Sequence, residues 1–244
     1  MTKNIIPFLI LLVTIVNPKI SMAQKTITFP SKDGLTITAD EYLANDTLPY
    51  IILCHQAGYS RGEYKETALE FNKLGYNCIA IDLRSGKEVN GIKNETVLAA
   101  IKANKPTTYL DTEQDILAAI DYVSAKSKKK IILLGSSYSA SLVLKIGTTN
   151  DKVKAVIAFS SGEYFGNKLN LRESIKTFNK PLFVTSAKNE AAEVNLLIKE
   201  IKSPIKQQFI PTENGIHGSR ALWKSTPNNN EYWKALIEFM KNVK

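Results

Sequence analysis

The sequence predicts an α/β protein in which a mostly parallel sheet of eight strands lies between two layers of helices. Short apolar runs alternate with longer segments whose apolar residues recur at helical spacing, a pattern typical of a sheet covered on both faces. No linker, internal repeat or low-complexity tract divides the chain. Right-handed crossovers between parallel strands then produce a three-layer α/β/α sandwich.

The composition is that of one globular domain. The chain has 244 residues, of which 44% are hydrophobic and 23% are charged, and this composition excludes a disordered chain. The formal net charge is +9, but the lysines are spread along the chain. Their densest run, 126–130, falls between a predicted helix and a predicted strand and has no interleaved aromatic residues. We therefore expect no nucleic-acid partner.

The first 23 residues have the pattern of a secretory signal peptide. Lys3 precedes an almost wholly apolar run over 5–16, and Pro18 is followed by Ser21-Met22-Ala23, with small residues where a signal peptidase cuts. We expect cleavage after Ala23, export to the periplasm or the medium, and a single mature domain over 24–244. An uncleaved anchor is the alternative. The apolar run is shorter than the ~20 residues that span a bilayer as a helix, so we expect no stable membrane insertion.

In the N-terminal half, short apolar runs predict strands and helical spacing predicts one long helix. The turn Lys32-Asp33-Gly34 separates an opening pair of strands. Gly75 ends a predicted helix over 62–74. The polar segment 85–109 is expected to be a loop with a short helix that lies over the site. The predicted strands are 25–30, 35–42, 49–54 and 77–83.

In the C-terminal half, strands and helices alternate more regularly. Residues 111–124 form an amphipathic pattern, and 165–178 is a connection with about one helical turn. Only about twenty residues separate the strand 153–159 from the strand 181–185, so no large lid fits between them. The other predicted elements are strands 130–134 and 206–210, and helices 138–146, 191–201 and 229–243.

The two cysteines are predicted to be buried free thiols. Cys54 ends one apolar run and Cys78 begins another, so in parallel neighbouring strands they lie too far apart for a disulfide. The chain has no cluster of cysteine and histidine with the spacing of a zinc site. We therefore expect neither a metal nor an organic cofactor.

The strongest local signal for chemistry is Gly135-Ser136-Ser137-Tyr138-Ser139, between a predicted strand and a predicted helix. A serine in such a tight turn is exposed above the sheet, with the helix N-terminus beside it. Small residues are needed two positions before and after the serine, because the turn packs closely. Gly135 and Ser139 meet this need, which makes Ser137 the candidate nucleophile in preference to Ser136, Ser139 or Ser141.

A serine hydroxyl needs a base, and the chain offers only two histidines. His217 lies in a glycine-flanked loop after the last strand, where the loops of a parallel sheet gather around one crevice. His55 follows the strand 49–54, and together with Gln56 it is expected to support this loop by hydrogen bonds or to line the substrate pocket. We therefore predict that His217 is the base.

A carboxylate is expected to orient the base, and it too should follow a strand. Glu190 comes after the strand 181–185 and produces the chain order serine, acid, histidine. Glu163, after the preceding strand, is the rival. Acyl transfer also needs N–H donors for the oxyanion. We expect these from Tyr138 and Ala57, with Gln56 as the second choice in its loop.

These residues resemble those of the α/β-hydrolase superfamily, and within it the small dienelactone-hydrolase-like group. The resemblance covers nearly all of 25–244 and implies the α/β-hydrolase fold, with Ser137 as nucleophile, Glu190 as acid and His217 as base. Three residues depart from the family pattern. Ser137 stands where dienelactone hydrolases proper have a cysteine, and Ser139 stands where the turn has its second glycine. Glu190 stands where aspartate is commoner. The motifs are His55-Gln56-Ala57-Gly58, Gly135-x-Ser137-x-Ser139, the segment 181–190 and Gly215-Ile216-His217-Gly218.

The resemblance and the serine nucleophile together point to an exported hydrolase of small or medium carboxylic esters that works through an acyl-enzyme. Its partner is then a small-molecule ester substrate. Two alternatives stay open: an inactive hydrolase-like protein kept for binding, and a serine peptidase or acyl transferase of the same fold.

Overall fold

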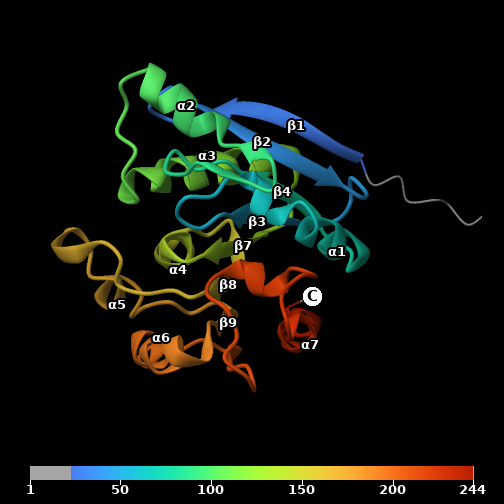
Figure 1. The fold of residues 1–244 in the computed structure, drawn as a ribbon, viewed down its shortest axis with the longest axis vertical. Coiled ribbons are helices and arrows are strands. Elements are labelled where there is room, and N and C mark those ends of the chain that lie inside the picture. Colours follow the sequence, from blue (N-terminus) through green and yellow to red (C-terminus); the bar gives the residue numbers. More distant parts are fainter. Residues whose placement is uncertain (1–22, 244) are drawn as a thin grey trace, which may run out of the picture.

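A central sheet of eight strands organises the protein in a computed structural model that describes residues 23–243 (Figure 1). The strands follow the order β1-β2-β4-β3-β7-β8-β9-β10 across the sheet. The predicted signal peptide lies outside the described residues except for Ala23, with which the first strand begins. The strands are β1 (Ala23–Pro30), β2 (Thr36–Leu43), β3 (Tyr50–Cys54), β4 (Asn77–Ile81), β7 (Ile131–Ser136), β8 (Val153–Phe159), β9 (Leu182–Thr185) and β10 (Lys206–Phe209).

Most of the sheet is parallel, as the sequence predicts. The pairs β4–β3, β3–β7, β7–β8, β8–β9 and β9–β10 are parallel, whereas β1 and β2 add an antiparallel edge. In the described chain, the parallel strands therefore all end at one edge of the sheet. This edge carries the loops that form the candidate site.

Helices cover both faces of the sheet (Figure 1). One face packs against α1 (Thr67–Lys73) and α7 (Asn229–Lys241). The other packs against α3 (Glu113–Lys126), α4 (Tyr138–Thr149) and α6 (Ala191–Ile198). The predicted three-layer sandwich is confirmed. The remaining helices are α2 (Glu95–Lys102) and α5 (Leu171–Ser174), with short 3-10 turns η1 (Arg61–Tyr64), η2 (Leu110–Thr112), η3 (Gly166–Lys168), η4 (Lys188–Glu190) and η5 (Ser219–Leu222).

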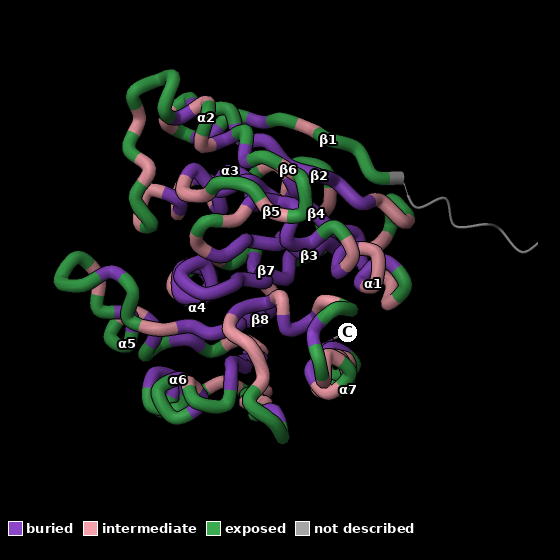
Figure 2. Tube along the Cα trace, viewed as in Figure 1, coloured by how far each residue is buried: buried purple, intermediate pink, exposed green. Residues whose placement is uncertain are grey.

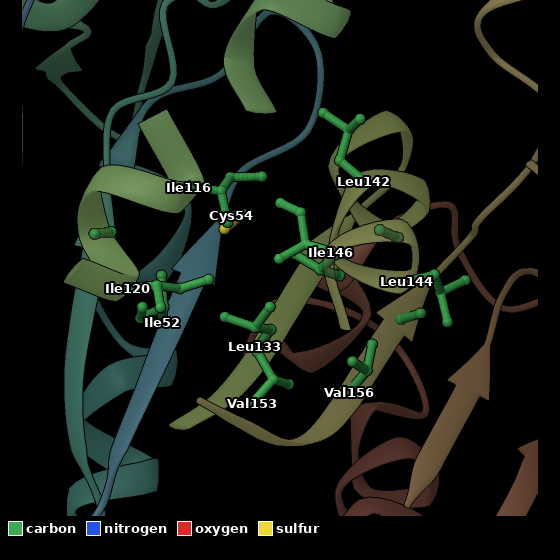
Figure 3. Close-up of a cluster of buried hydrophobic side chains, with 14 of the residues drawn as sticks. Ile52, Cys54, Ile116, Ile120, Leu133, Leu142, Leu144, Ile146, Val153 and Val156 are labelled. Carbon is green, nitrogen blue, oxygen red and sulfur yellow. The ribbon is translucent and has the colours of Figure 1, made fainter. Parts of the chain in front are cut away.

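The central strands are buried on both sides, and their apolar runs form two cores. Figure 2 shows these strands as buried, with exposed residues confined mainly to the outer helix surfaces and the loops. In Figure 3, Leu133 of β7 lies between Ile120 of α3 and Ile146 of α4, and all three side chains are buried. This packing fixes α4, and with it the turn between β7 and α4.

The segment between β2 and α3 departs most from the sequence prediction. The predicted helix over 62–74 is divided into η1 and α1, because the tighter first turn directs the buried Glu63 and Tyr64 inward. The predicted loop 85–109 contains α2 and a two-stranded ribbon, β5 (Glu88–Val89) and β6 (Ile92–Lys93). Asn90 and Gly91 turn this ribbon with positive φ angles of 54° and 74°. The pair Asn-Gly is a strong hairpin signal, and it was available in the sequence.

The two cysteines are free and buried, as predicted. Cys54 faces the core beneath α3 and α4, whereas Cys78 faces the core beneath α1 and α7, so the sheet lies between the two thiols. Over 23–243, the protein has no helix with the length and apolar character that crossing a membrane requires.

Candidate active site

Ser137 lies in a strained turn between β7 and α4. Its φ of 60° and ψ of −124° are in a region that non-glycine residues rarely adopt. A Cβ atom on Gly135 would lie 2.6 Å from the backbone of Ala140, so only glycine allows α4 to approach β7 this closely. The turn therefore has the geometry that the motif predicts, with Ser137 at its tip.

Ser139 occupies the position where the family pattern has glycine. Its hydroxyl both accepts and donates hydrogen bonds. The backbone N–H of Ser136 donates to Ser139 Oγ at 2.9 Å. The hydroxyl in turn lies 2.8 Å from the carbonyl oxygen of Cys54 and 2.9 Å from that of Ser136, both of which can accept its proton. The side chain is completely buried. A serine here links the turn to β3 instead of crowding it.

Ser137, His217 and Glu190 form a continuous chain of hydrogen bonds. Ser137 Oγ lies 2.8 Å from His217 Nε2, and His217 Nδ1 lies 2.6 Å from Glu190 Oε1. The Nδ1–H of a neutral ring donates to the carboxylate, which leaves Nε2 free to accept the serine proton. This is the arrangement that activates a serine nucleophile.

The Glu190 carboxylate is held by further donors. Ser160 Oγ donates to Glu190 Oε2 at 2.6 Å, and the N–H of Ala187 donates to the same oxygen at 3.2 Å. Burial works to raise the pKa of Glu190, but the hydrogen bonds from His217 and Ser160 outweigh it, so the pKa lies below its ordinary value. Glu190 is therefore an anion at neutral pH, as the partner of an imidazolium must be.

Glu163, the rival acid, lies elsewhere. Its carboxylate accepts hydrogen bonds from the N–H groups of Leu171 and Arg172 at 2.8 and 2.9 Å. These are the first residues of α5, so Glu163 caps the N-terminus of that helix. The structure brings Glu190, and not Glu163, to His217.

Two backbone N–H groups are candidates for oxyanion donors. Tyr138 is the first residue of α4, where an N–H has no partner within the helix. The N–H of Ala57 donates to no group within 23–243. By contrast, the N–H of Gln56 donates to Glu63 Oε2 at 2.8 Å and is not free.

His55 is fully buried and makes hydrogen bonds both within its own loop and to the segment after β4. The N–H of Leu83 donates to His55 Nε2 at 2.9 Å, so the proton is on Nδ1, which donates to the carbonyl oxygen of Gln56 at 2.8 Å. Burial lowers the pKa of His55 to about 4. The neutral ring ties the loop that carries Ala57 to the end of β4.

Glu63 is a buried carboxyl that the sequence analysis did not single out. It accepts the N–H of Gln56 through Oε2, and Ser219 Oγ donates to Oε1 at 2.6 Å. The N–H of Ser219 donates to Ser136 Oγ at 2.8 Å. Glu63 thus connects the Ala57 loop with the loop after His217, which is bonded to the serine turn. Nothing in the local sequence separates it from the partly exposed Glu66 and Glu70.

The site is open to solvent on the described surface. The side chains of His217 and Glu190 are 38% and 29% exposed, and Ser137 is 8% exposed. The connection between β8 and β9 contains only η3 and α5 and forms no large lid. Two tyrosines border the serine. The ring of Tyr109 stacks on that of Tyr138 at 4.2 Å, and Tyr164 donates from its hydroxyl to the carbonyl oxygen of Ser160 at 2.7 Å.

No group of three or more histidine, cysteine, aspartate or glutamate residues in the described part of the chain is arranged to hold a metal ion. Ser137 instead contacts the imidazole of His217, which in turn contacts the carboxylate of Glu190. Their arrangement suits nucleophilic acyl transfer.

A family model described as the dienelactone hydrolase family matches residues 39–243. This range includes every residue of the site described above. No curated protein sequence matches the chain.

Solved structures with the same fold include hydrolases from several organisms. An esterase from Pyrococcus furiosus is 18% identical, with a TM-score of 0.69, over 95% of this chain and 96% of that chain. A dienelactone hydrolase from Anabaena variabilis is 12% identical, with a TM-score of 0.70, over 91% and 98%. The α/β hydrolase GrgF from a Penicillium species is 12% identical, with a TM-score of 0.71, over 91% and 99%. At these identities the likeness shows a shared fold.

The buried Glu63 makes stability depend on pH. Burial raises the pKa of its carboxyl from 4.5 to about 7 in the folded protein. Between these values the folded state binds more protons than the unfolded chain, so the free energy of unfolding falls as the pH rises through this window. Glu63→Gln should remove a decline of up to about 3 kcal/mol between about pH 5 and pH 8.

Urea unfolding of the wild type and of Glu63→Gln at both pH values measures this difference. Glu66→Gln, on the same segment, is the matched control and should keep the wild-type decline. An equal decline in Glu63→Gln would show that Glu63 is ionised throughout.

Proposed function

The chain belongs to the dienelactone hydrolase family, and on that premise we propose that it is a serine-dependent hydrolase of carboxylic esters. The family and the hydrolase fold support hydrolysis as the reaction class. The serine in place of a cysteine nucleophile supports ordinary carboxylic esters as substrates, and not dienelactones.

The observation that carries the proposal is the hydrogen-bonded chain from Ser137 through His217 to Glu190, with distances of 2.8 and 2.6 Å. Each neighbour of the serine has a use in acyl transfer. The base accepts a proton and the carboxylate orients the base. The N–H groups of Tyr138 and Ala57, which donate to no group within 23–243, are candidates for binding the oxyanion. A protein kept only for binding would not need this combination.

The proposed reaction has two halves. Ser137 Oγ attacks the carbonyl carbon while His217 Nε2 takes its proton, and the oxyanion accepts hydrogen bonds from the N–H groups of Tyr138 and Ala57. His217 then donates the proton to the leaving alcohol, and an acyl-enzyme forms. Water repeats these steps on the acyl-enzyme, releases the acid and restores Ser137. Glu190 stabilises the imidazolium in both halves.

The open site supports small or medium esters as substrates. Long acyl chains need a covered apolar channel, and the short connection between β8 and β9 provides no such cover. The substrate partner of the proposed enzyme is therefore a small molecule.

We also propose that the enzyme is exported and acts as the mature chain 24–244. The apolar run over 5–16 and the small residues before Gln24 support this proposal. When the full chain is expressed in a bacterium with its native leader, N-terminal sequencing of the purified protein should begin at Gln24. A protein that keeps its first residues and remains in the cytoplasm would contradict export.

Ser137 should be the residue that reacts with active-site-directed phosphonates. A fluorophosphonate probe should label the wild type, and Ser137→Ala should abolish both the labelling and the turnover of p-nitrophenyl acetate. Ser174→Ala changes a serine on α5 whose hydroxyl donates to the carbonyl oxygen of Asn170, and it serves as the matched control, which should still be labelled. Equal labelling of Ser137→Ala and wild type would refute the assignment. Turnover by wild type no faster than by His217→Ala would favour a binding protein.

Glu190 and Glu163 should differ sharply in their effect on catalysis. Glu190→Gln removes the anion that orients and stabilises His217, so kcat for p-nitrophenyl acetate should fall by about 10³-fold to 10⁴-fold. Glu163→Gln changes a carboxylate that caps α5 and should leave kcat within about twofold of wild type. Steady-state kinetics on the two variants tests the pair. A larger loss in Glu163→Gln would reverse the roles.

A further inference from the structure

A small aromatic hollow is lined by Tyr164 and by Tyr109, which stacks on Tyr138, the residue after Ser137. We propose that it is the subsite for the acyl group and that it selects esters of arylalkanoic acids, a substrate class that rests on the proposed ester hydrolysis. The hollow measures about 180 Å³. Its lining comes from the segment before α3 and the segment after β8: Thr108, Tyr109, Leu110, Tyr164, Phe165 and Lys168.

Tyr164 forms the wall that joins the hollow to the nucleophile. Its hydroxyl donates to the carbonyl oxygen of Ser160 at 2.7 Å and lies near the Ser137 side chain. Ser141 of α4 holds the same loop by donating to the carbonyl oxygen of Gly162 at 2.8 Å. The Tyr164 ring is therefore fixed between Ser137 and the hollow.

Tyr109 forms the opposite wall. Its ring stacks on Tyr138 with centroids 4.2 Å apart and planes inclined by 14°. Tyr138 is fixed in turn, because it is buried and its hydroxyl donates to the carbonyl oxygen of Ser85 at 3.2 Å. The wall is thus attached to the residue whose backbone N–H faces the oxyanion in the proposed reaction.

The two faces of the sheet separate the acyl side of the site from the alcohol side. Leu110 and Phe165 pack into the core beneath α3 and α4, whereas Ile216, beside His217, packs into the core beneath α1 and α7. Figure 1 shows the segment after α2 and the segment leading to α5 on the side of α3 and α4, with α7 on the other side. His217 must reach the leaving oxygen, so the alcohol lies on its side. The acyl group then extends toward the hollow.

The exposed faces of the two tyrosines explain why an aromatic group fits. Tyr109 and Tyr164 are each 39% exposed, although most large apolar side chains of the described residues are buried. A volume of about 180 Å³ suits one ring better than a long chain. Ring-on-ring contacts add about 0.5–1.5 kcal/mol beyond area burial, and a saturated ring of similar size does not gain this energy. The difference corresponds to about twofold to twelvefold in kcat/KM.

Two pairs of esters test the subsite and its side. Ethyl phenylacetate and ethyl cyclohexylacetate differ only in the acyl ring, whereas benzyl acetate and cyclohexylmethyl acetate differ only in the alcohol. In Tyr109→Leu the ratio of kcat/KM within the acyl pair should fall by about twofold to twelvefold relative to wild type, and the ratio within the alcohol pair should not change. Comparing ratios between proteins cancels the intrinsic reactivity of the esters. Leu196→Ala, an exposed position on α6, is the control and should keep both ratios.

Binding to Ser137→Ala separates this inference from the proposed reaction. Calorimetry should show that Ser137→Ala binds phenylacetate more tightly than cyclohexylacetate. The double variant Ser137→Ala/Tyr109→Leu should bind the two acids equally. Ester hydrolysis with an unchanged acyl ratio in Tyr109→Leu, or a change confined to the alcohol pair, would overturn the subsite and leave the esterase intact. Selective binding without hydrolysis by wild type would support the subsite and overturn the esterase. Absence of both would overturn the two together.

Discussion

The close approach of α4 to β7 is the constraint on which the rest of the site depends. It forces Ser137 into a positive φ of 60° and leaves no room for a side chain at Gly135. Strain of this kind costs on the order of 1–3 kcal/mol and persists only where the surroundings hold it. Here the apolar core beneath α4 and the hydroxyl of Ser139, which reaches the carbonyl oxygen of Cys54, hold the turn. The result is a hydroxyl presented above the sheet, 2.8 Å from His217 Nε2.

The strand order then brings distant parts of the chain to that hydroxyl. Strands β3, β7, β8, β9 and β10 are adjacent and parallel, so the loops that follow them share one edge of the sheet. Each of these loops supplies one part of the site: Ala57, Ser137, Ser160, Glu190 and His217. His217 meets a serine 80 positions earlier and a glutamate 27 positions earlier in the chain. A parallel sheet makes such contacts without any linker or second domain.

Buried polar groups keep these loops in register with one another. The neutral His55 bonds the Ala57 loop to the end of β4. Glu63 bonds the same loop to Ser219, which is two residues after His217 in the chain. A fully buried carboxyl is costly, as the raised pKa of Glu63 shows. A polar network of this kind holds loops rigidly at the edge of an apolar core, where loops alone would be mobile. The exposed tyrosines are the complementary feature, since they leave apolar surface free beside the nucleophile.

The sequence by itself determined the fold class and the strands of the central sheet, and it identified Ser137 and His217 as candidates, because apolar periodicity and a strand-turn-helix motif are local patterns. The ribbon at Asn90-Gly91 carried an equally local signal. Only the tertiary structure decided between Glu190 and Glu163, which are both glutamates after a strand and differ in what they face. The tertiary structure also shows that the N–H of Gln56 donates to Glu63, whereas the N–H of Ala57 does not. It brings Tyr109 and Tyr164 together in the lining of one hollow. These differences depend on contacts between residues far apart in the chain, and a local sequence pattern does not encode such contacts.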